Sequence, residues 1–544
     1  MEFYRKITGL IKELKVAPAI RRFVSHNRRV FPLAPGATDR KPVVLFELSQ
    51  LRSAQIGYSY LANALAEEYQ ARIVGYVPEF LESWWRKRYF ALRRFIGADP
   101  MNIFRSFGTT EFLNLVPTAA QKAKARTLFN SILPGLKKNL DVERLSIDGI
   151  LIGDLIYDSY LMKYRQPTIR RESREFQDFL LLSFELFVAW NDYLDSHDVR
   201  AINVTHCVYN VAIPLRIAVK RGIPVFQVNV THLYRLTESR LFAYNDFFYF
   251  PERFAALPAD VREAGLAEAK RRIERRFAGE VGVDMAYSTK SAYSDFKHDR
   301  LLRPSSRKKI LIATHCFFDS PHSYGNNTFP DFYDWMSFLG EMSEATDYDW
   351  YIKTHPDFLP GTKEVIDGLI AKYPKLTLLP ADSSHHQIIG EGINLALTVF
   401  GTIAFEYAAL GIPVINASPS NPHIAYDFNL HARTIEEYRS MLLNLDALDP
   451  KIDKQKIYEY YFMRHIFNTE DIFFKNYEKA VIDLDGYYGQ FEPKVYDRWL
   501  EDWSSERHQA IGKAMLSFIR SGDFRMDYRH YGREFTVKSV EQRS

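Results

Sequence analysis

The sequence is poor in cysteine, with only Cys207 and Cys316 among its 544 residues. Two cysteines so far apart exclude a disulfide framework and fit a reducing compartment. No group of cysteines and histidines has the spacing of a zinc site. The patterns G-x-x-x-x-G-K-[S/T] and G-x-G-x-x-G are also missing, which argues against a P-loop ATPase and a standard NAD enzyme.

Long apolar runs are missing too. No uninterrupted apolar stretch is long enough to span a bilayer, and charges interrupt the N-terminus where a signal peptide needs an apolar region. We therefore expect a cytoplasmic protein. Neither sign of charge dominates, since 71 Lys and Arg stand against 67 Asp and Glu and the formal net charge is +4. The composition therefore gives no indication of a nucleic-acid partner.

Aromatic residues, in contrast, are abundant, with 40 Phe, 33 Tyr and 7 Trp. The hydrophobic content of 47% and the charged content of 25% are typical of a folded soluble protein. A chain of 544 residues is too long for one ordinary core, so we expect two or three domains.

Basic charge is concentrated in two stretches. Residues 1–30 hold eight Lys or Arg against two Glu, and their apolar residues fall on one helical face. Residues 84–96, WWRKRYFALRRFI, mix aromatic and basic side chains as interfacial helices do. Each stretch is either a surface helix that packs its apolar stripe on the core or a peripheral contact with the anionic inner face of the cytoplasmic membrane.

Strand-like and helix-like stretches alternate twice along the chain. Apolar runs such as KPVVLFEL and RAINVTH alternate with helical segments, and the same pattern restarts at KKILIAT. This alternation predicts parallel sheets with helical crossovers, and hence an α/β fold with two Rossmann-like domains. The predicted parts are a basic amphipathic segment 1–40, a first Rossmann-like domain 41–235, a helical connector 236–307, a second Rossmann-like domain 308–450 and a helical tail 451–544.

The stretch YIKTHP places Lys353, His355 and Pro356 where a predicted strand of the second domain ends. Ligands of open α/β sheets bind outside the carboxyl ends of the strands, so a cation and an imidazole there suit a phosphate. The acidic pair Asp347 and Asp349 resembles a metal-binding DxD, but it precedes the strand and would lie at the opposite end of the sheet. We therefore expect no metal.

The stretch VFGTIAFEYAALG supplies a second strand end. Gly401 makes a tight turn, Thr402 is placed to cap the following helix, and Glu406 lies one helical turn further on the same side. The N–H groups at a helix start favour a phosphate, and a carboxylate can accept hydrogen bonds from ribose hydroxyls. Alone, this pattern is an ordinary strand, turn and helix; together with Lys353 it matches the needs of a nucleotide-sugar site.

Two further loops of this domain carry polar side chains. The loop 314–327 follows the first strand of the domain and should open onto the same site, while 382–389 begins a short helix. Each residue alone could equally stabilise its own loop, and we expect the histidines of 382–389 to be structural. The additional donor-binding candidates are His315, Asp319, His322, Asn326, Ser383 and Ser384.

The stretches KTHP, DSSHHQII and TVFGTIAFEYAALGIPVINA resemble the donor-binding domain of GT-B glycosyltransferases. The likeness is to the bacterial capsule and surface-polysaccharide group, which includes Kdo-transferase-like enzymes, and it covers about 305–430. It implies two Rossmann-like domains that face each other across a cleft. The implied donor is CMP-Kdo or another CMP-ulosonic acid, with a glycan or lipid-linked acceptor and no cofactor beyond the nucleotide-sugar. Donor binding is carried over onto Lys353, His355, Pro356, Thr402 and Glu406.

The catalytic group should come from the first domain. The stretch DGILIGD is predicted to be a strand of the first domain, with Asp154 at its end and Asp158 one helical turn on. His206 follows the predicted strand RAINVT, and Glu47 ends the first predicted strand. Any of them could take the proton of an acceptor hydroxyl, and a carboxylate could be a nucleophile if the enzyme retains configuration. The structural alternatives are a helix cap for Asp154 and a buried, hydrogen-bonded His206.

Three other functions fit the same pattern. The donor could be a UDP- or GDP-sugar. A sugar-nucleotide 2-epimerase has a similar two-domain shape and would change a nucleotide-sugar with no acceptor present. A non-catalytic scaffold for polysaccharide assembly would keep the fold and show no turnover.

Overall fold

The computed structural model describes residues 16–31, 42–49, 51–77, 99–138, 140–285, 288, 290–293, 298–355, 360–468 and 471–542. Of the sequence predictions, residues 1–15, the stretch 84–96 and Pro356 lie outside the described residues.

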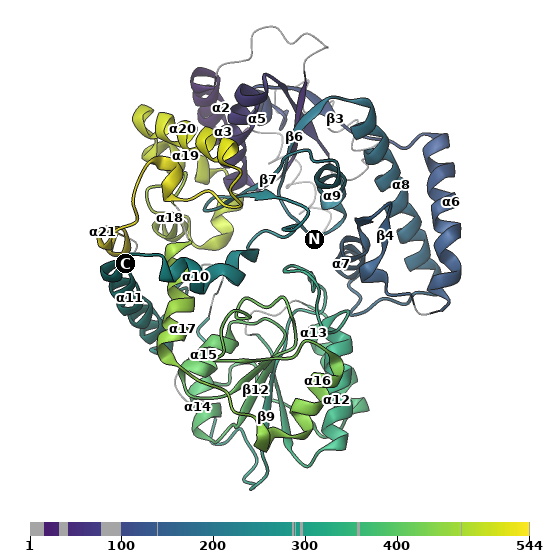
Figure 1. The fold of residues 1–544 in the computed structure, drawn as a ribbon, viewed down its shortest axis with the longest axis vertical. Helices are drawn as coiled ribbons and strands as arrows, with labels where there is room; N and C mark the ends of the chain where they lie inside the picture. The colour runs from purple at the N-terminus through teal and green to yellow at the C-terminus, as the bar shows by residue number, and fades with distance from the viewer. Residues whose placement is uncertain are drawn as a thin grey trace, which may run out of the picture. The chain divides into compact units, whose positions relative to one another are not determined.

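The chain forms two compact units, and each combines segments that the predicted continuous ranges kept apart. Unit 1 consists of the described residues among Met1–Gly153, Gln177–Leu241 and Glu470–Glu534. Unit 2 consists of those among Asp154–Phe176, Phe242–Thr469 and Phe535–Ser544. Figure 1 shows the chain as a ribbon with its helices and strands labelled, coloured from purple at the N-terminus to yellow at the C-terminus.

Unit 1 contains a six-stranded sheet in the order β3-β2-β1-β6-β7-β8. All neighbouring strands are parallel except β7 and β8, which are antiparallel. The strands are β1 (Val43–Glu47), β2 (Arg72–Tyr76), β3 (Thr109–Leu113), β6 (Val199–Val204), β7 (Val225–Val228) and β8 (Leu233–Leu236). The helices are α2 (Pro18–Val30), α3 (Arg52–Tyr69), α5 (Asn102–Arg105), α6 (Ala119–Leu136), α8 (Arg174–Ser196, in this unit from Gln177), α9 (Ile213–Lys220), α18 (Tyr477–Asp483), α19 (Lys494–Asp502) and α20 (Ser505–Ser521).

Unit 2 contains a second six-stranded sheet in the order β11-β10-β9-β12-β13-β14, with all neighbouring strands parallel. The strands are β9 (Lys309–Ala313), β10 (Asp349–Lys353), β11 (Leu376–Leu378), β12 (Leu395–Thr398), β13 (Val414–Asn416) and β14 (Leu430–His431). The helices are α7 (Gly153–Tyr164, in this unit from Asp154), α10 (Phe250–Ala255), α11 (Ala259–Phe277), α12 (Phe332–Ala345), α13 (Thr362–Lys372), α14 (His385–Gly390), α15 (Ile403–Ala409), α16 (Ile435–Leu443), α17 (Lys454–Tyr461) and α21 (Val537–Glu541).

Numbered along the chain within each unit, both sheets have the strand order 3-2-1-4-5-6 of the Rossmann fold. The predicted α/β class with two Rossmann-like domains is therefore confirmed. The facing arrangement of the two domains stays a prediction.

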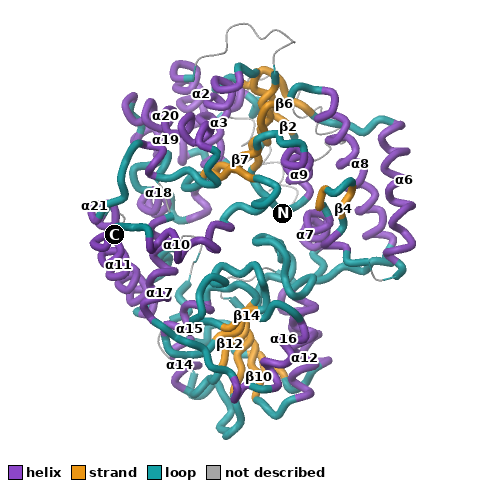
Figure 2. Tube along the Cα trace, in the orientation of Figure 1, coloured by secondary structure: helices purple, strands orange, loops and turns teal. Residues whose placement is uncertain are grey.

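Side chains alternate between the two faces of the unit 2 sheet. Ile310 and Ile312 pack with α12, α13 and α16, whereas Leu311 between them packs with α14 and α15. Figure 2 shows the strands (orange) with α12 and α16 on one side and α14 and α15 on the other. Because both faces are covered, the strands read as continuous apolar runs, which is why the sequence revealed them.

The part of the C-terminal tail between Glu470 and Glu534 belongs to unit 1. α20 lies against α3, and α19 lies against both α2 and α3. The ring of Phe23 on α2 stacks on that of Tyr496, with centroids 4.1 Å apart, and Arg22 forms an ion pair with Asp497. For Pro18–Val30, the structure therefore shows a basic helix that packs its apolar stripe on the core.

The stretch DGILIGD is not a strand of the parallel sheet, which corrects the sequence prediction. β5 (Ile150–Leu151) pairs antiparallel with β4 (Ser146–Ile147) in a separate hairpin. Its two-residue loop consists of Asp148 and Gly149, both with positive φ (51° and 73°). An Asp-Gly pair favours this kind of turn, so this apolar stretch folds back as a hairpin and does not join the parallel sheet.

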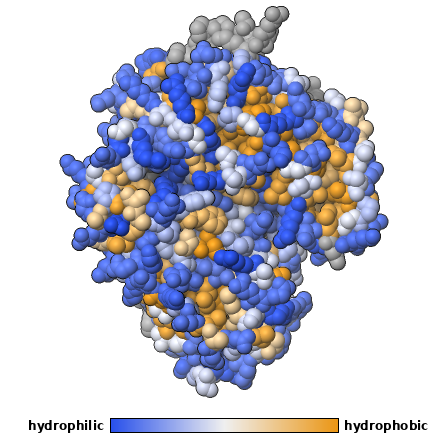
Figure 3. Space-filling view, viewed as in Figure 1, coloured by the Kyte–Doolittle hydropathy of each residue, from blue (hydrophilic) through white to orange (hydrophobic). Residues whose placement is uncertain are grey.

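In the part of the chain that the structure describes, no helix combines the length and apolar character needed to cross a bilayer. Hydrophilic residues cover most of the face drawn in Figure 3, and hydrophobic residues show in separate areas.

Candidate functional site

A pocket of about 330 Å³ lies at the carboxyl ends of β9, β10 and β12 in unit 2. The last residue of each of these strands, Ala313, Lys353 and Thr398, lines it. The strand order reverses between β9 and β12, which is where ligands of open α/β sheets bind. The predicted site residues that the structure brings together here are His315, Lys353, His355, Gly401, Thr402 and Glu406.

Lys353 is a buried cation, with 3% of its surface exposed. Its Nζ donates a hydrogen bond to the carbonyl oxygen of Ala381 at 3.0 Å, and among the described residues no carboxylate lies within ion-pair distance of it. Burial lowers the pKa of Lys353 to about 8, although the charge of Asp382 acts in the opposite direction. A buried cation without a paired anion is costly, so this position favours an anionic ligand.

Glu406 is buried and forms hydrogen bonds with two other side chains. Arg276 donates to its Oε1 from Nε at 2.9 Å and from Nη2 at 2.5 Å. The hydroxyl of Tyr293 donates to Oε2 at 2.8 Å. A carboxylate has about four acceptor positions, so one of them remains for a ligand.

Arg276 was missed by the sequence analysis. It lies in the last turn of α11, in the run KRRIERRF of the predicted connector, and it lines the pocket. Arg272, one helical turn earlier, is buried on the same face and bonds to Glu268. The four-residue spacing of these two arginines indicated a shared helix face, but nothing in the run indicated that this face is buried.

His315 is held in a defined tautomer. Its Nε2 accepts the backbone N–H of Val399 at 3.2 Å and contacts Oγ1 of Thr398 at 3.0 Å, so the ring proton is on Nδ1. Burial, and secondarily the nearby His355, lower the pKa of His315 to about 3. The ring is therefore neutral, and it stacks on Phe332 with centroids 4.6 Å apart.

The turn before α15 differs from its predicted form. Thr402 stands at the N-cap position but its side chain makes no capping hydrogen bond, so the predicted cap is wrong. Thr398 holds the turn before the helix, because its Oγ1 accepts the N–H of Gly401 at 3.0 Å. A Cβ at position 401 would lie 2.8 Å from that Oγ1, which explains the glycine.

Five predicted donor-binding residues are not among the described residues that line the pocket. Asp319 and Asn326 are exposed on their loop. Ser383 and Ser384 are buried before α14, and Ser384 does not cap that helix. Of the histidines that follow, His385 bonds to the Tyr407 hydroxyl and also lines the pocket, and His386 bonds to the Phe277 carbonyl. The fifth residue is His322.

His322 forms a buried pair with Asp158, with Nδ1 and Oδ1 2.6 Å apart. Burial raises the pKa of Asp158 to about 6, although His322 opposes this rise. Asp158 and the equally buried Asp154 both lie on α7 within unit 2, not within the first Rossmann-like domain as predicted. The sequence prediction placed α7 in the first domain because of its position in the chain. The hydrogen bond between Asp158 and His322, which lies 164 residues later, holds α7 in unit 2.

Glu47 and His206 remain in unit 1. Glu47 is buried at the end of β1, where its Oε2 accepts the N–H of Thr205 at 2.8 Å. Burial raises the pKa of Glu47 to about 7, although the bonds from Thr205 oppose the rise. His206 is exposed, so the alternative of a buried histidine is wrong. The catalytic roles of Glu47, His206, Asp154 and Asp158 stay predictions.

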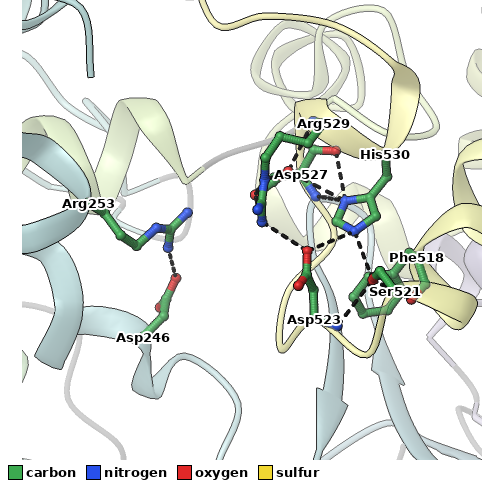
Figure 4. Close-up of polar contacts among 8 residues, drawn as sticks. All are labelled: Asp246, Arg253, Phe518, Ser521, Asp523, Asp527, Arg529 and His530. Atoms are coloured by element: carbon green, nitrogen blue, oxygen red, sulfur yellow. Dashed lines mark hydrogen bonds and ion pairs between the residues drawn. The ribbon is translucent and has the colours of Figure 1, made fainter. Parts of the chain in front are cut away.

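A separate cluster in unit 1 has the residue types of a Ser-His-Asp triad (Figure 4). Ser521 Oγ lies 3.3 Å from Nε2 of His530, and Asp527 lies beside Nδ1. However, the N–H of Asp527 donates to that Nδ1 at 3.0 Å, so Nδ1 lacks the proton that a triad aspartate accepts. Arg529 also holds the Asp527 carboxylate. The cluster therefore caps the short helix Tyr528–Tyr531. The other contact drawn in Figure 4 is an ion pair in unit 2 between Arg253 and Asp246.

Within the described ranges, no group of three or more His, Cys, Asp or Glu side chains is arranged to hold a metal ion.

No protein-family model and no curated protein sequence matches the chain. Solved structures similar to it include the UDP-GlcNAc 2-epimerase from Neisseria meningitidis, with 12% identity over 78% of this chain and 96% of that one, and a TM-score of 0.21. Sucrose-phosphate synthase from Thermosynechococcus elongatus has 11% identity over 88% and 98%, with a TM-score of 0.26. A glycosyltransferase from Rickettsia africae has 10% identity over 89% and 100%, with a TM-score of 0.22. Because these TM-scores are low, the fold assignment rests on the strand order of the two sheets.

Proposed function

We propose that the protein is a glycosyltransferase that binds a nucleotide-sugar in the unit 2 pocket. The observation that carries the proposal is the buried Lys353, with no carboxylate within ion-pair distance among the described residues, in the pocket that lies where the strand order reverses. This position suits a phosphate, and the exposed residues His355 and Lys290 also line the pocket. When a phosphate leaves the donor, these groups would stabilise its charge, so that no metal is required.

The rest of the pocket suits the nucleoside and the sugar. Phe400 and Tyr324 line one part of it with their rings edge to face, 5.3 Å between centroids. Glu406 keeps one acceptor position for a hydroxyl, and Arg276 and Tyr293 hold its carboxylate in place. Polar groups fixed in place beside apolar and aromatic side chains are typical of small-molecule sites.

The donor expected from the sequence is CMP-Kdo or another CMP-ulosonic acid, with UDP- and GDP-sugars as alternatives. The acceptor would be a glycan or lipid-linked sugar in surface-polysaccharide synthesis. Glu47 and His206 remain the candidate bases of unit 1. Peripheral membrane contact through 84–96 is part of the same proposal.

Thermal stabilisation by CMP, CDP, UDP, GDP and ADP, with and without EDTA, tests donor binding. At a nucleotide concentration of about 100 Kd the native state gains about 2.7 kcal/mol, which raises Tm. We expect one nucleotide to stabilise the protein whether or not EDTA is present, and Lys353→Met to reduce the gain to about half at the same nucleotide concentration. Lys363→Met, which changes an exposed lysine, is the control. No shift with any nucleotide would contradict the proposal.

Product analysis separates transfer from the alternatives. The nucleotide-sugar whose nucleotide stabilises the protein is incubated with and without acceptor oligosaccharides. A transferase releases nucleotide and extends the acceptor. A change of the sugar without any acceptor would indicate an epimerase, and binding without turnover in either mixture would indicate a scaffold.

A further inference from the structure

A short turn in unit 1 presents aromatic rings to solvent. The 3₁₀ segment Tyr487–Phe491 follows α18, and Tyr488 and Phe491 on it are 70% and 43% exposed. Their rings are near parallel, 28° apart, with centroids separated by 6.3 Å. The ring of Tyr487 touches both, and Ile482 just before the turn is 69% exposed. We call these four residues the aromatic turn.

The aromatic turn is rigidly built. Gly486 has a φ of 98°, and a Cβ at Gly489 would lie 2.0 Å from the carbonyl oxygen of Leu484, so both positions require glycine. The buried side chain of Gln490 accepts hydrogen bonds from Ser53 and Tyr477, each at 2.9 Å. Exposed rings held in one geometry lose little conformational entropy when a ligand binds.

The charges around the aromatic turn do not favour an anionic ligand. Asp483 forms an ion pair with Arg498 at 3.1 Å, and Asp485 pairs with Lys494. The exposed Glu492 adds a third carboxylate, and Arg52, which donates to the carbonyl oxygen of Phe491 at 3.0 Å, adds a third cation. Because these three carboxylates balance the three cations, neither phosphates nor anionic lipid headgroups find the excess of positive charge that attracts them.

We propose that the aromatic turn binds a neutral glycan chain. The electron-rich faces of aromatic rings attract the C–H groups on the flat side of a sugar ring, and two near-parallel faces suit consecutive sugars. The carboxylates of Asp483, Asp485 and Glu492 can accept hydrogen bonds from sugar hydroxyls. The inference deepens the proposed function, because a transferase that extends a glycan gains from a second, non-catalytic contact that keeps the chain close.

The size of the aromatic turn distinguishes a glycan from a second protein copy. A stable protein interface buries about 800 Å² on each partner, which takes about 20 or more residues. Four side chains cover far less than that area. A sugar chain needs only a few rings in line, and it gains affinity by repetition along its length.

Native affinity electrophoresis tests the inference directly. The wild-type protein runs in gels that contain dextran, glycogen or hydroxyethyl cellulose as neutral glycans, and in gels that contain dextran sulfate. We expect at least one neutral glycan to retard the protein and dextran sulfate not to do so. Tyr488→Ala should weaken the retardation about tenfold, as expected for one lost ring contact. Phe248→Ala, at a ring that is 42% exposed in unit 2, is the matched control.

The other outcomes each overturn the inference. These are no retardation by any neutral glycan, equal retardation of wild type and Tyr488→Ala, binding to vesicles of phosphatidylcholine and phosphatidylglycerol that Tyr488→Ala abolishes, and a concentration-dependent dimer that this variant dissociates. Because Tyr488 is exposed, its loss should leave Tm unchanged, which separates binding from folding. The nucleotide stabilisation of unit 2 is measured independently, so the glycan contact and the donor site can fail separately.

Discussion

The two sheets share a strand order but differ at their carboxyl ends. In unit 2, the first, second and fourth strands end in a small residue, a lysine and a threonine, and the pocket opens there. In unit 1 the matching strands end in a carboxylate, a phenol and a valine. The matched pairs are Glu47 with Ala313, Tyr76 with Lys353, and Val204 with Thr398.

This difference shows separately what the strand order and what the side chains contribute to a binding site. The shared strand order decides where polar side chains collect, and the residue at each strand end decides which charge the place favours. The unit 2 edge holds a buried cation that suits an anion. The unit 1 edge holds a buried carboxyl group that retains its proton up to about pH 7.

Removing the ion pair beneath the unit 2 pocket should have the largest effect. Arg276→Ala leaves the Glu406 carboxylate buried with only the Tyr293 hydroxyl, and such losses cost about 3–5 kcal/mol. Urea unfolding measures the change in the free energy of unfolding. The neighbouring Arg275 pairs with Glu280 near the surface, so Arg275→Ala should cost less than about 1 kcal/mol. Equal costs for the two variants would contradict the role given to Arg276.

The unit 1 carboxyl group should make stability depend on pH. The pKa of Glu47 rises on folding from an ordinary 4.5 to about 7, so the folded protein binds this proton more tightly than the unfolded chain does. Stability therefore falls, by at most about 3 kcal/mol, as pH rises through this window. Glu47→Gln should remove that slope and be the more stable protein above pH 7. The control is Glu238→Gln, at an exposed carboxylate; a slope that persists in Glu47→Gln would assign it to another group.

Nucleotide binding to unit 2 should depend on pH in a higher range, because the pKa of Lys353 is about 8. Lys353→Met is expected to weaken nucleotide binding about tenfold at pH 7, because a charge-assisted hydrogen bond is lost. In the wild type, affinity should fall as pH rises past about 8, where Lys353 loses its proton. Lys353→Arg keeps its charge and should show no such fall. Titration calorimetry between pH 7 and pH 9 measures all three proteins, and a wild-type affinity that is constant over this range would exclude Lys353 from the site.

The smallest effect is expected at the turn after β12. Gly401→Ala places a Cβ 2.8 Å from Thr398 Oγ1, which must move and disturb the bond to His315, at a cost of about 1 kcal/mol. Gly368 on α13 has nothing within 4 Å of its Cβ position, so Gly368→Ala should be neutral or slightly stabilising. Urea unfolding and nucleotide binding of both variants compare the two glycines; a Gly401→Ala protein as stable as Gly368→Ala would contradict the close packing.

Much of the fold was readable in the sequence because the central strands are buried on both faces. The runs around Val43–Glu47 and Lys309–Ala313 are continuously apolar, and both were predicted as first strands. The edge strand Thr109–Leu113 was not predicted, because it is partly exposed and reads TTEFL. The antiparallel Leu233–Leu236 was also missed, since the expected pattern was one of parallel crossovers.

The candidate site was predictable where strand ends determine position. Lys353 and Gly401 follow apolar runs directly, so topology alone brings them together. Arg276 and Tyr293 come from a segment without strands, and only packing places them against Glu406. His322 turned away from the pocket because a partner 164 residues earlier in the chain holds it, which local sequence does not reveal.

The segmented make-up of the two units has a consequence for synthesis. Their six segments alternate along the chain, which therefore passes from one unit to the other five times. A ribosome releases residues 154–176 long before the sheet of unit 2 exists, and unit 1 waits for 470–534. Unit 1 is completed only when residue 534 has emerged, and unit 2 only with its last segment, 535–544. Each should therefore expose apolar surface to chaperones until nearly the whole chain has emerged, and a truncation that removes the residues from 470 onward should leave both units unfinished.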